Sequence, residues 1–105
     1  MNQPKKERGK YRPSYWPSKP ATQSVWTFDQ AGLLCIEGRE CVIFVQERPP
    51  HCDRGNYLAN LDSVGKLEEQ IDGADLWPRF YFDLERAKLE IEAWLKKQKQ
   101  WIEDP

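Results

Sequence analysis

Apolar and polar residues alternate along much of the segment between residues 24 and 61, and this pattern predicts a series of short β-strands. Turn-forming residues separate the apolar runs, which are rich in β-branched and aromatic side chains. The expected strands cover residues 25–28, 33–37, 41–45 and 56–61. A short fifth strand is expected at residues 79–82.

The third of these strands is continuously apolar, unlike the others. Successive side chains of a strand point to opposite faces, so Cys41, Ile43 and Val45 would lie on one face of the sheet. Val42 and Phe44 would lie on the other face. A strand that is apolar on both faces is usually central and covered twice.

The C-terminal segment has the period of an amphipathic helix. Its apolar residues fall within an arc of about 120°, and they are Leu84, Ala87, Ile91, Trp94, Leu95, Trp101 and Ile102. Asp83 is expected to be the N-cap, because its carboxylate can accept from the free amides of the first turn. Two ion pairs are expected at i,i+4 spacing, Arg86 with Glu90 and Glu92 with Lys96. The helical segment is expected to run to Ile102, and Gln98, which interrupts the apolar stripe, marks where the helix would begin to leave the core.

These elements predict an α+β fold. We expect an antiparallel meander of four to five strands with one long C-terminal amphipathic helix packed on one face, all within a single domain of residues 24–105. One helix covers one face only, so Val42 and Phe44, grouped here with Tyr81, need a second cover. Either the segment 63–78, which contains Trp77, folds over them, or the face is exposed and binds a partner.

Residues 1–23 differ from the rest in composition. They contain four prolines and almost no aliphatic residue, so they are expected to form a disordered tail outside the core. The first 20 residues hold six basic residues and one acidic residue, a net charge of +5. The remainder holds 10 basic and 16 acidic residues, a net charge of −6, although the whole chain carries only −1. Such an asymmetry steers charged partners.

The cysteines and the hydropathy of the chain indicate its cellular compartment. Three cysteines, Cys35, Cys41 and Cys52, form no disulfide pattern. The sequence has no apolar run of the length that a signal peptide or a membrane span needs. We therefore expect a cytoplasmic protein with no membrane partner, and we expect no cofactor because no phosphate-binding glycine loop is present.

Three candidate sites for chemistry are weak. His51 and Cys52 are neighbours, but adjacent side chains of an extended loop point apart and no second histidine exists. A metal site made by the three cysteines and His51 would have a spacing unlike that of zinc sites. The carboxylates Asp72, Asp75 and Asp83 are expected in a solvated loop and a helix cap. Enzymatic activity is therefore not predicted.

The residues expected to bind a partner come from two places, the tail and the second face of the sheet. They are Lys5, Lys6, Arg8, Lys10, Tyr11, Arg12, Tyr15, Trp16, Val42, Phe44, Trp77 and Tyr81. The prediction is a small non-enzymatic binding module, an adaptor or inhibitor of a protein partner. The alternative is a nucleic-acid-associated accessory protein that binds through the tail, where cations for phosphates alternate with aromatic rings for bases. The oligomeric state is not predicted.

Two stretches of the sequence carry a resemblance. They run from His51 to Tyr57 and from Trp77 to Lys88. Both resemble small uncharacterised bacterial proteins, some of which are carried on phages or other mobile elements. The resemblance implies no activity and no site residues. It implies a non-catalytic accessory role.

Overall fold

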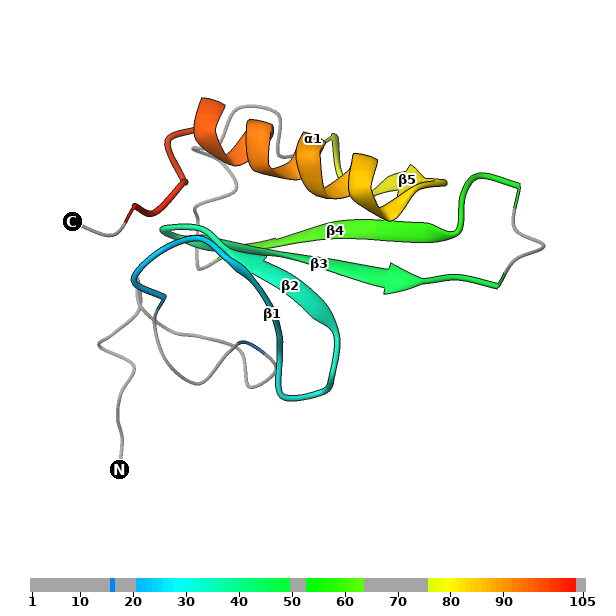
Figure 1. Cartoon of the computed structure of the whole chain (residues 1–105), viewed down its shortest axis with the longest axis horizontal. Helices are drawn as coiled ribbons and strands as arrows, with labels where there is room; N and C mark the ends of the chain where they lie inside the picture. The colour runs from blue at the N-terminus through cyan, green and yellow to red at the C-terminus, as the bar shows by residue number, and fades with distance from the viewer. Residues whose placement is uncertain (1–15, 17–20, 50–52, 64–75, 104–105) are drawn as a thin grey trace.

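The computed structural model describes residue 16 and residues 21–49, 53–63 and 76–103. They form one antiparallel sheet in the order β1-β2-β3-β4-β5 and one helix that packs on one face of it, which confirms the α+β meander (Figure 1). The elements are β1 Trp26–Phe28, β2 Leu34–Glu37, β3 Cys41–Glu47, β4 Tyr57–Ser63, β5 Arg79–Tyr81 and α1 Leu84–Lys97. Within the described ranges, no helix is long and apolar enough to cross a membrane.

The turn between β1 and β2 is held by the side chain of Asp29. Asp29 Oδ1 accepts from the backbone N–H groups of Ala31 at 2.9 Å and Leu33 at 2.8 Å. Gly32 follows with a φ of 90°, a conformation that favours glycine. The turn therefore holds the backbone of residues 29–33 through one aspartate, as expected for a turn that begins with this residue type.

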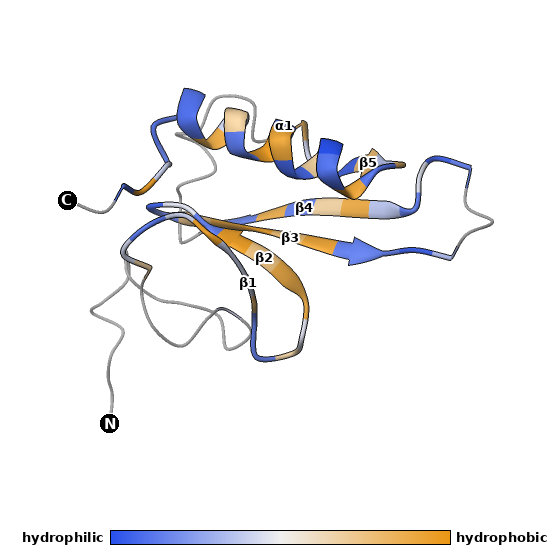
Figure 2. Ribbon diagram, viewed as in Figure 1, coloured by the Kyte–Doolittle hydropathy of each residue, from blue (hydrophilic) through white to orange (hydrophobic). Residues whose placement is uncertain are grey.

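The central strand β3 is buried on both faces, as its sequence predicts. The register pairs Ile43 with Leu61 and Val45 with Ala59, which places these residues on the face that α1 covers. Val42 and Phe44 belong to a separate apolar cluster on the other face. Figure 2 shows the hydrophobic colour running along β2 and β3. The sheet therefore has two apolar faces, and each needs a cover.

Helix α1 begins as the sequence indicates. Asp83 is the N-cap, and its Oδ2 accepts from Arg86 N at 3.0 Å. Arg86 also pairs with Glu90 at 2.7 Å, on the exposed side of the helix. The expected pair of Glu92 with Lys96 is replaced: Glu92 Oε2 accepts instead from the Trp26 indole at 2.8 Å, which ties the middle of the helix to β1.

The end of α1 differs from the prediction. The helix stops at Lys97, with Gln98 as the C-cap, so Trp101 and Ile102 lie beyond it. The physical cause is Lys99, whose φ of 61° turns the backbone into the left-handed region. Trp101 still packs against the helix-side core. The apolar pattern of the sequence therefore continues past Lys97, although the helix itself ends there.

The segment after the helix is fastened to the first three strands. Gln100 is buried, its backbone oxygen accepts from Arg39 N at 2.8 Å, and its Oε1 accepts from Glu40 N at 2.8 Å. Ile102 O accepts from Ser24 N at 2.9 Å, and Ile102 N donates to Ser24 Oγ at 2.9 Å. We call these contacts the C-terminal clasp. They join the β2–β3 turn and the start of β1 to the end of the chain.

The second face of the sheet is covered by a residue from the predicted tail. Trp16 is only 2% exposed, and it packs on Cys35, Val42 and Phe44. Its indole N–H donates to Asp62 Oδ2 at 2.6 Å. The expectation that the tail stays outside the core is therefore wrong for Trp16, because an aromatic ring gains more by covering an apolar face than a polar segment does. Of the remaining tail, residues 21–23 are described and are half-buried or exposed, whereas residues 1–15 and 17–20 lie outside the described residues, so their disorder stays a prediction.

We predict that Trp94→Ala lowers the free energy of unfolding by about 3–5 kcal/mol. Trp94 is buried in the helix-side core, and its ring meets that of Trp77 edge to face with a centroid distance of 5.4 Å. Chemical denaturation would measure the change. Leu89→Ala is the matched control on the same helix, since Leu89 is 65% exposed and its loss should cost less than about 0.5 kcal/mol. Equal effects of the two substitutions would contradict the assignment of Trp94 to the core.

We also predict that Trp16→Ala destabilises the domain by about 3 kcal/mol, because it uncovers the second face of the sheet. Trp16→Phe keeps most of the apolar cover and loses the hydrogen bond to Asp62, so its cost should be smaller, about 1–2 kcal/mol. Thermal unfolding of both variants beside the wild type would rank them. A melting temperature of Trp16→Ala equal to that of the wild type would show that the ring does not support the fold.

Candidate functional site

The structure does not bring Cys35 and Cys41, the two described candidates for a metal site, close to each other. His51 and Cys52 lie outside the described residues. Cys41 is in the helix-side core, whereas Cys35 is in the cluster on the opposite face, so the sheet separates the two thiols. Among the residues that the structure describes, no three His, Cys, Asp or Glu side chains are grouped so that they could hold a metal ion.

Both described thiols are poor nucleophiles. Burial raises the pKa of the Cys35 thiol and raises that of Cys41 to about 12, from 9.0 for an ordinary thiol. Glu40 and Glu37 add to the shift at Cys41, because a nearby negative charge disfavours a thiolate. The thiolate is the reactive form, so these cysteines act as small apolar core residues.

Asp83 serves the helix cap described above, so this carboxylate is structural, as expected. The other two members of the proposed acidic group, Asp72 and Asp75, lie outside the described residues. The acidic group therefore provides no described pair of carboxylates for acid–base chemistry.

The residues predicted to bind a partner fall into two sets. Seven of them lie outside the described residues, namely Lys5, Lys6, Arg8, Lys10, Tyr11, Arg12 and Tyr15. The other five are buried within the chain itself: Trp16, Val42, Phe44, Trp77 and Tyr81. The part of the second face formed by Val42 and Phe44 is therefore covered by Trp16.

Trp77 and Tyr81 lie on the other face from the one expected. The register pairs Tyr81 with Tyr57, and both Trp77 and Tyr81 belong to the helix-side core. Grouping Tyr81 with Val42 and Phe44 is therefore wrong. The sequence does not fix the register of a strand that follows a long connection, and a shift by one residue exchanges the two faces.

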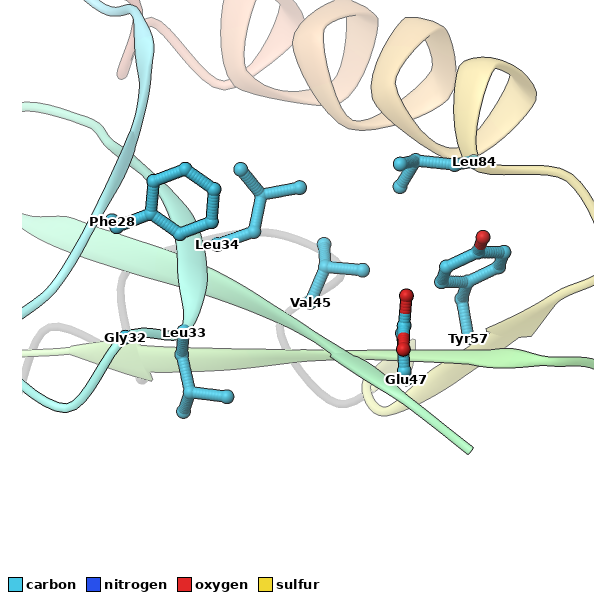
Figure 3. A pocket seen from close by; sticks show the side chains of 8 residues that line it. All are labelled: Phe28, Gly32, Leu33, Leu34, Val45, Glu47, Tyr57 and Leu84. Atoms are coloured by element: carbon cyan, nitrogen blue, oxygen red, sulfur yellow. The ribbon is translucent and has the colours of Figure 1, made fainter. Parts of the chain in front are cut away.

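The structure reveals a groove that the sequence analysis did not identify. It lies between the β1–β2 hairpin, the end of β3, the start of β4 and the first residue of α1. Its volume is about 370 Å³. It is lined by Phe28, Gly32, Leu33, Leu34, Val45, Glu47, Tyr57 and Leu84. Figure 3 shows Leu34, Val45 and Tyr57 pointing toward the side where Leu84 lies, whereas Leu33 points away. We call this the hairpin groove.

The hairpin groove exists because the helix and the hairpin diverge. Trp26 is bound to Glu92, in the middle of α1. Beyond Trp26 the β1–β2 hairpin curves away from the helix (Figure 1). Phe28 lies on the same face of β1 as Trp26, two residues on, and the divergence leaves it 69% exposed.

The chemistry of the groove is apolar with one charged group. Leu34, Val45 and Leu84 supply aliphatic surface and Phe28 supplies an aromatic ring. Glu47 adds an exposed carboxylate, and the half-buried Tyr57 adds a phenol. A surface of this composition can hold an apolar side chain and attract a neighbouring cation.

We predict that Cys35 and Cys41 resist alkylation in the folded protein. A pKa of about 12 in place of 9.0 leaves Cys41 with about a thousandfold less thiolate near pH 8. Iodoacetamide treatment followed by peptide mass spectrometry should find both residues unmodified in buffer and modified in denaturant. Modification of Cys41 at the same rate in both conditions would contradict its burial.

Comparisons with known proteins do not assign this chain to a family. No family model, no curated protein and no solved structure matches it. Its function therefore has to be argued from the surfaces that its own residues form.

Proposed function

We propose that this chain is a non-enzymatic binding module of the cytoplasm that acts as an adaptor or inhibitor of a protein partner through the hairpin groove. The observation that carries the proposal is Phe28, a large aromatic side chain that is 69% exposed at the rim of an apolar groove. Exposed aromatic residues beside a hollow are typical anchors of protein interfaces.

The position of Phe28 adds a second reason. It lies on β1, which is the first strand in the order of the sheet and therefore an edge. An extended segment of a partner can align with an edge strand while one of its side chains enters an adjacent pocket. The groove lies directly beside β1, so both kinds of contact are available to one segment.

The charge of the groove defines the partner segment more closely. Glu47 places a carboxylate beside the apolar lining formed by Val45 and Leu34. The complementary partner is an extended segment with an apolar side chain that fills the groove and a lysine or arginine next to it. The resemblance implies an accessory role, and some of the similar proteins are carried on phages or other mobile elements. An accessory protein of such an element would use this contact to bind a host protein.

The lining favours binding over catalysis. Leu34, Val45 and Leu84 make most of its lining apolar, and Glu47 is the one charged residue among the described residues that line it. An apolar hollow beside a single charge suits the apolar side chain of a partner segment. This composition supports a binding role for the groove.

The proposal predicts that Phe28→Asp weakens binding of the partner at least tenfold, because it puts a charge beside an apolar contact and next to the carboxylate of Glu47. The partner would first be isolated from the native host with the wild-type chain as bait. Its affinity for each purified variant would then be measured by isothermal titration calorimetry. Binding should also show a negative heat-capacity change, the mark of buried apolar surface.

Leu89→Asp is the matched control. Leu89 is exposed to a similar extent, 65%, and it lies on α1 outside the groove lining. The control should change the affinity less than twofold, and circular dichroism should show both variants folded. Equal loss in the two variants, or unchanged affinity of Phe28→Asp, would remove the groove as the binding site.

A further inference from the structure

A second hollow lies at the opposite end of α1 and has a different chemistry. Its volume is about 460 Å³, and it is lined by Arg39, Lys96, Lys99, Trp101 and Glu103. Lys96 Nζ lies 4.6 Å from the centroid of the Trp101 ring. We call this the cationic hollow. It combines three cations with one aromatic ring and has one carboxylate among its lining residues.

The C-terminal clasp builds this hollow from segments distant in sequence. Arg39 belongs to the β2–β3 turn, and its backbone N–H is held by Gln100 O. Lys99 turns the backbone at the end of the helix, so that Trp101 leaves the helical path and packs at the border of the core. The three cations therefore converge because the clasp holds the turn against the helix end.

The charge of the hollow runs against that of the surrounding domain. Residues 21–105 hold 10 basic and 16 acidic residues, a net charge of −6. Among the described residues that line the hollow, by contrast, three are basic and one, Glu103, is acidic, a net charge of +2. A local patch that opposes the overall charge marks where an anion would be held.

The described segment that precedes β1 is bonded to the segment that lines the hollow. Ser24, where the tail meets the first strand, is hydrogen-bonded through its backbone and its hydroxyl group to Ile102, the residue after Trp101. The first 20 residues carry a net charge of +5. In the sequence, the most cationic segment therefore precedes by a few residues a described residue, Ser24, that is bonded to the segment carrying Trp101.

We propose that the cationic hollow binds the backbone of a single-stranded nucleic acid, with Arg39, Lys96 and Lys99 contacting phosphates and Trp101 stacking on a base. The proximity of Lys96 to the Trp101 ring suits a nucleotide, whose phosphate and base need a cation and an aromatic surface side by side. The volume falls within the range of small-ligand sites, about 300–1,000 Å³, so it can hold one nucleotide unit. An acidic protein segment would use the cations and would gain no stacking contact from the Trp101 ring, which already packs against Lys96 and the core.

Another cation–aromatic cluster is a weaker candidate. Arg48 and Arg54 lie over Phe80, with centroid distances of 4.7 and 5.5 Å. Arg48, however, donates through a guanidinium N–H to Gly55 O at 3.5 Å, and its backbone N–H donates to Asn56 O at 2.7 Å. Arg48 therefore already stabilises the connection between β3 and β4 through these hydrogen bonds.

The test uses the full chain and a short fluorescein-labelled oligothymidylate, with binding followed by fluorescence anisotropy over a range of salt concentrations. The double variant Lys96→Gln/Lys99→Gln should bind at least tenfold more weakly at low salt. The slope of log K against log salt should fall by about 1.4, because each lost phosphate contact on a single strand removes about 0.7. Trp101→Leu keeps an apolar side chain and should weaken single-strand binding at least fivefold, with a smaller effect on duplex.

The control is Arg86→Gln/Lys88→Gln, which removes the same charge from the other end of α1, about 15 Å away. It should change the affinity less than twofold. Polyglutamate serves as a competitor and should displace the oligonucleotide poorly. Four results would overturn the proposal: no binding at micromolar protein, unchanged binding by Lys96→Gln/Lys99→Gln, equal loss in the control, or equally effective displacement by polyglutamate. If Lys96→Gln/Lys99→Gln binds the oligothymidylate as tightly as the wild type, the affinity belongs to the tail and not to the hollow.

Discussion

The structure depends on a central strand that is apolar on both faces. β3 buries Ile43 and Val45 under α1, and it buries Val42 and Phe44 under Trp16. A small domain has few elements with which to cover two faces, and this one has a single helix in its described part. One aromatic residue from outside the sheet and helix, Trp16, therefore covers the part of the second face that Val42 and Phe44 form. The hydrogen bond from Trp16 to Asp62 fixes that ring against the end of β4.

Local patterns in the sequence account for most of the fold. The strand positions, the facing of β3 and the Asp83 cap follow from alternation, period and capping chemistry, which act over a few residues. Features set by distant contacts could not be obtained in this way. Trp16 finds a partner 46 residues away, and the face of Tyr81 depends on a register set across a long connection. The end of α1 was missed because Lys99 changes the backbone while the apolar period continues.

The two candidate surfaces were also beyond the reach of local patterns. The hairpin groove arises from the angle between a hairpin and a helix, and the cationic hollow arises from a clasp between residues 60 positions apart. One signal was present: Phe28 is a large aromatic residue beside a turn, at the end of a short strand. The two surfaces lie at opposite ends of α1, which has 14 residues and spans about 20 Å. If both proposals hold, one chain can carry a protein segment and a nucleic-acid strand at the same time.

The C-terminal clasp also bears on how the domain reaches its folded state. Ser24 and Ile102 are bonded across 78 residues, and Gln100 satisfies two amides of the β2–β3 turn. During synthesis the first hairpins leave the ribosome long before residues 100–102 exist. Until then the turn amides bond to water and the apolar faces of those hairpins stay uncovered, and contacts of such long range are slow to form. The clasp therefore makes completion of the first strands depend on residues that are made 60 to 78 positions later.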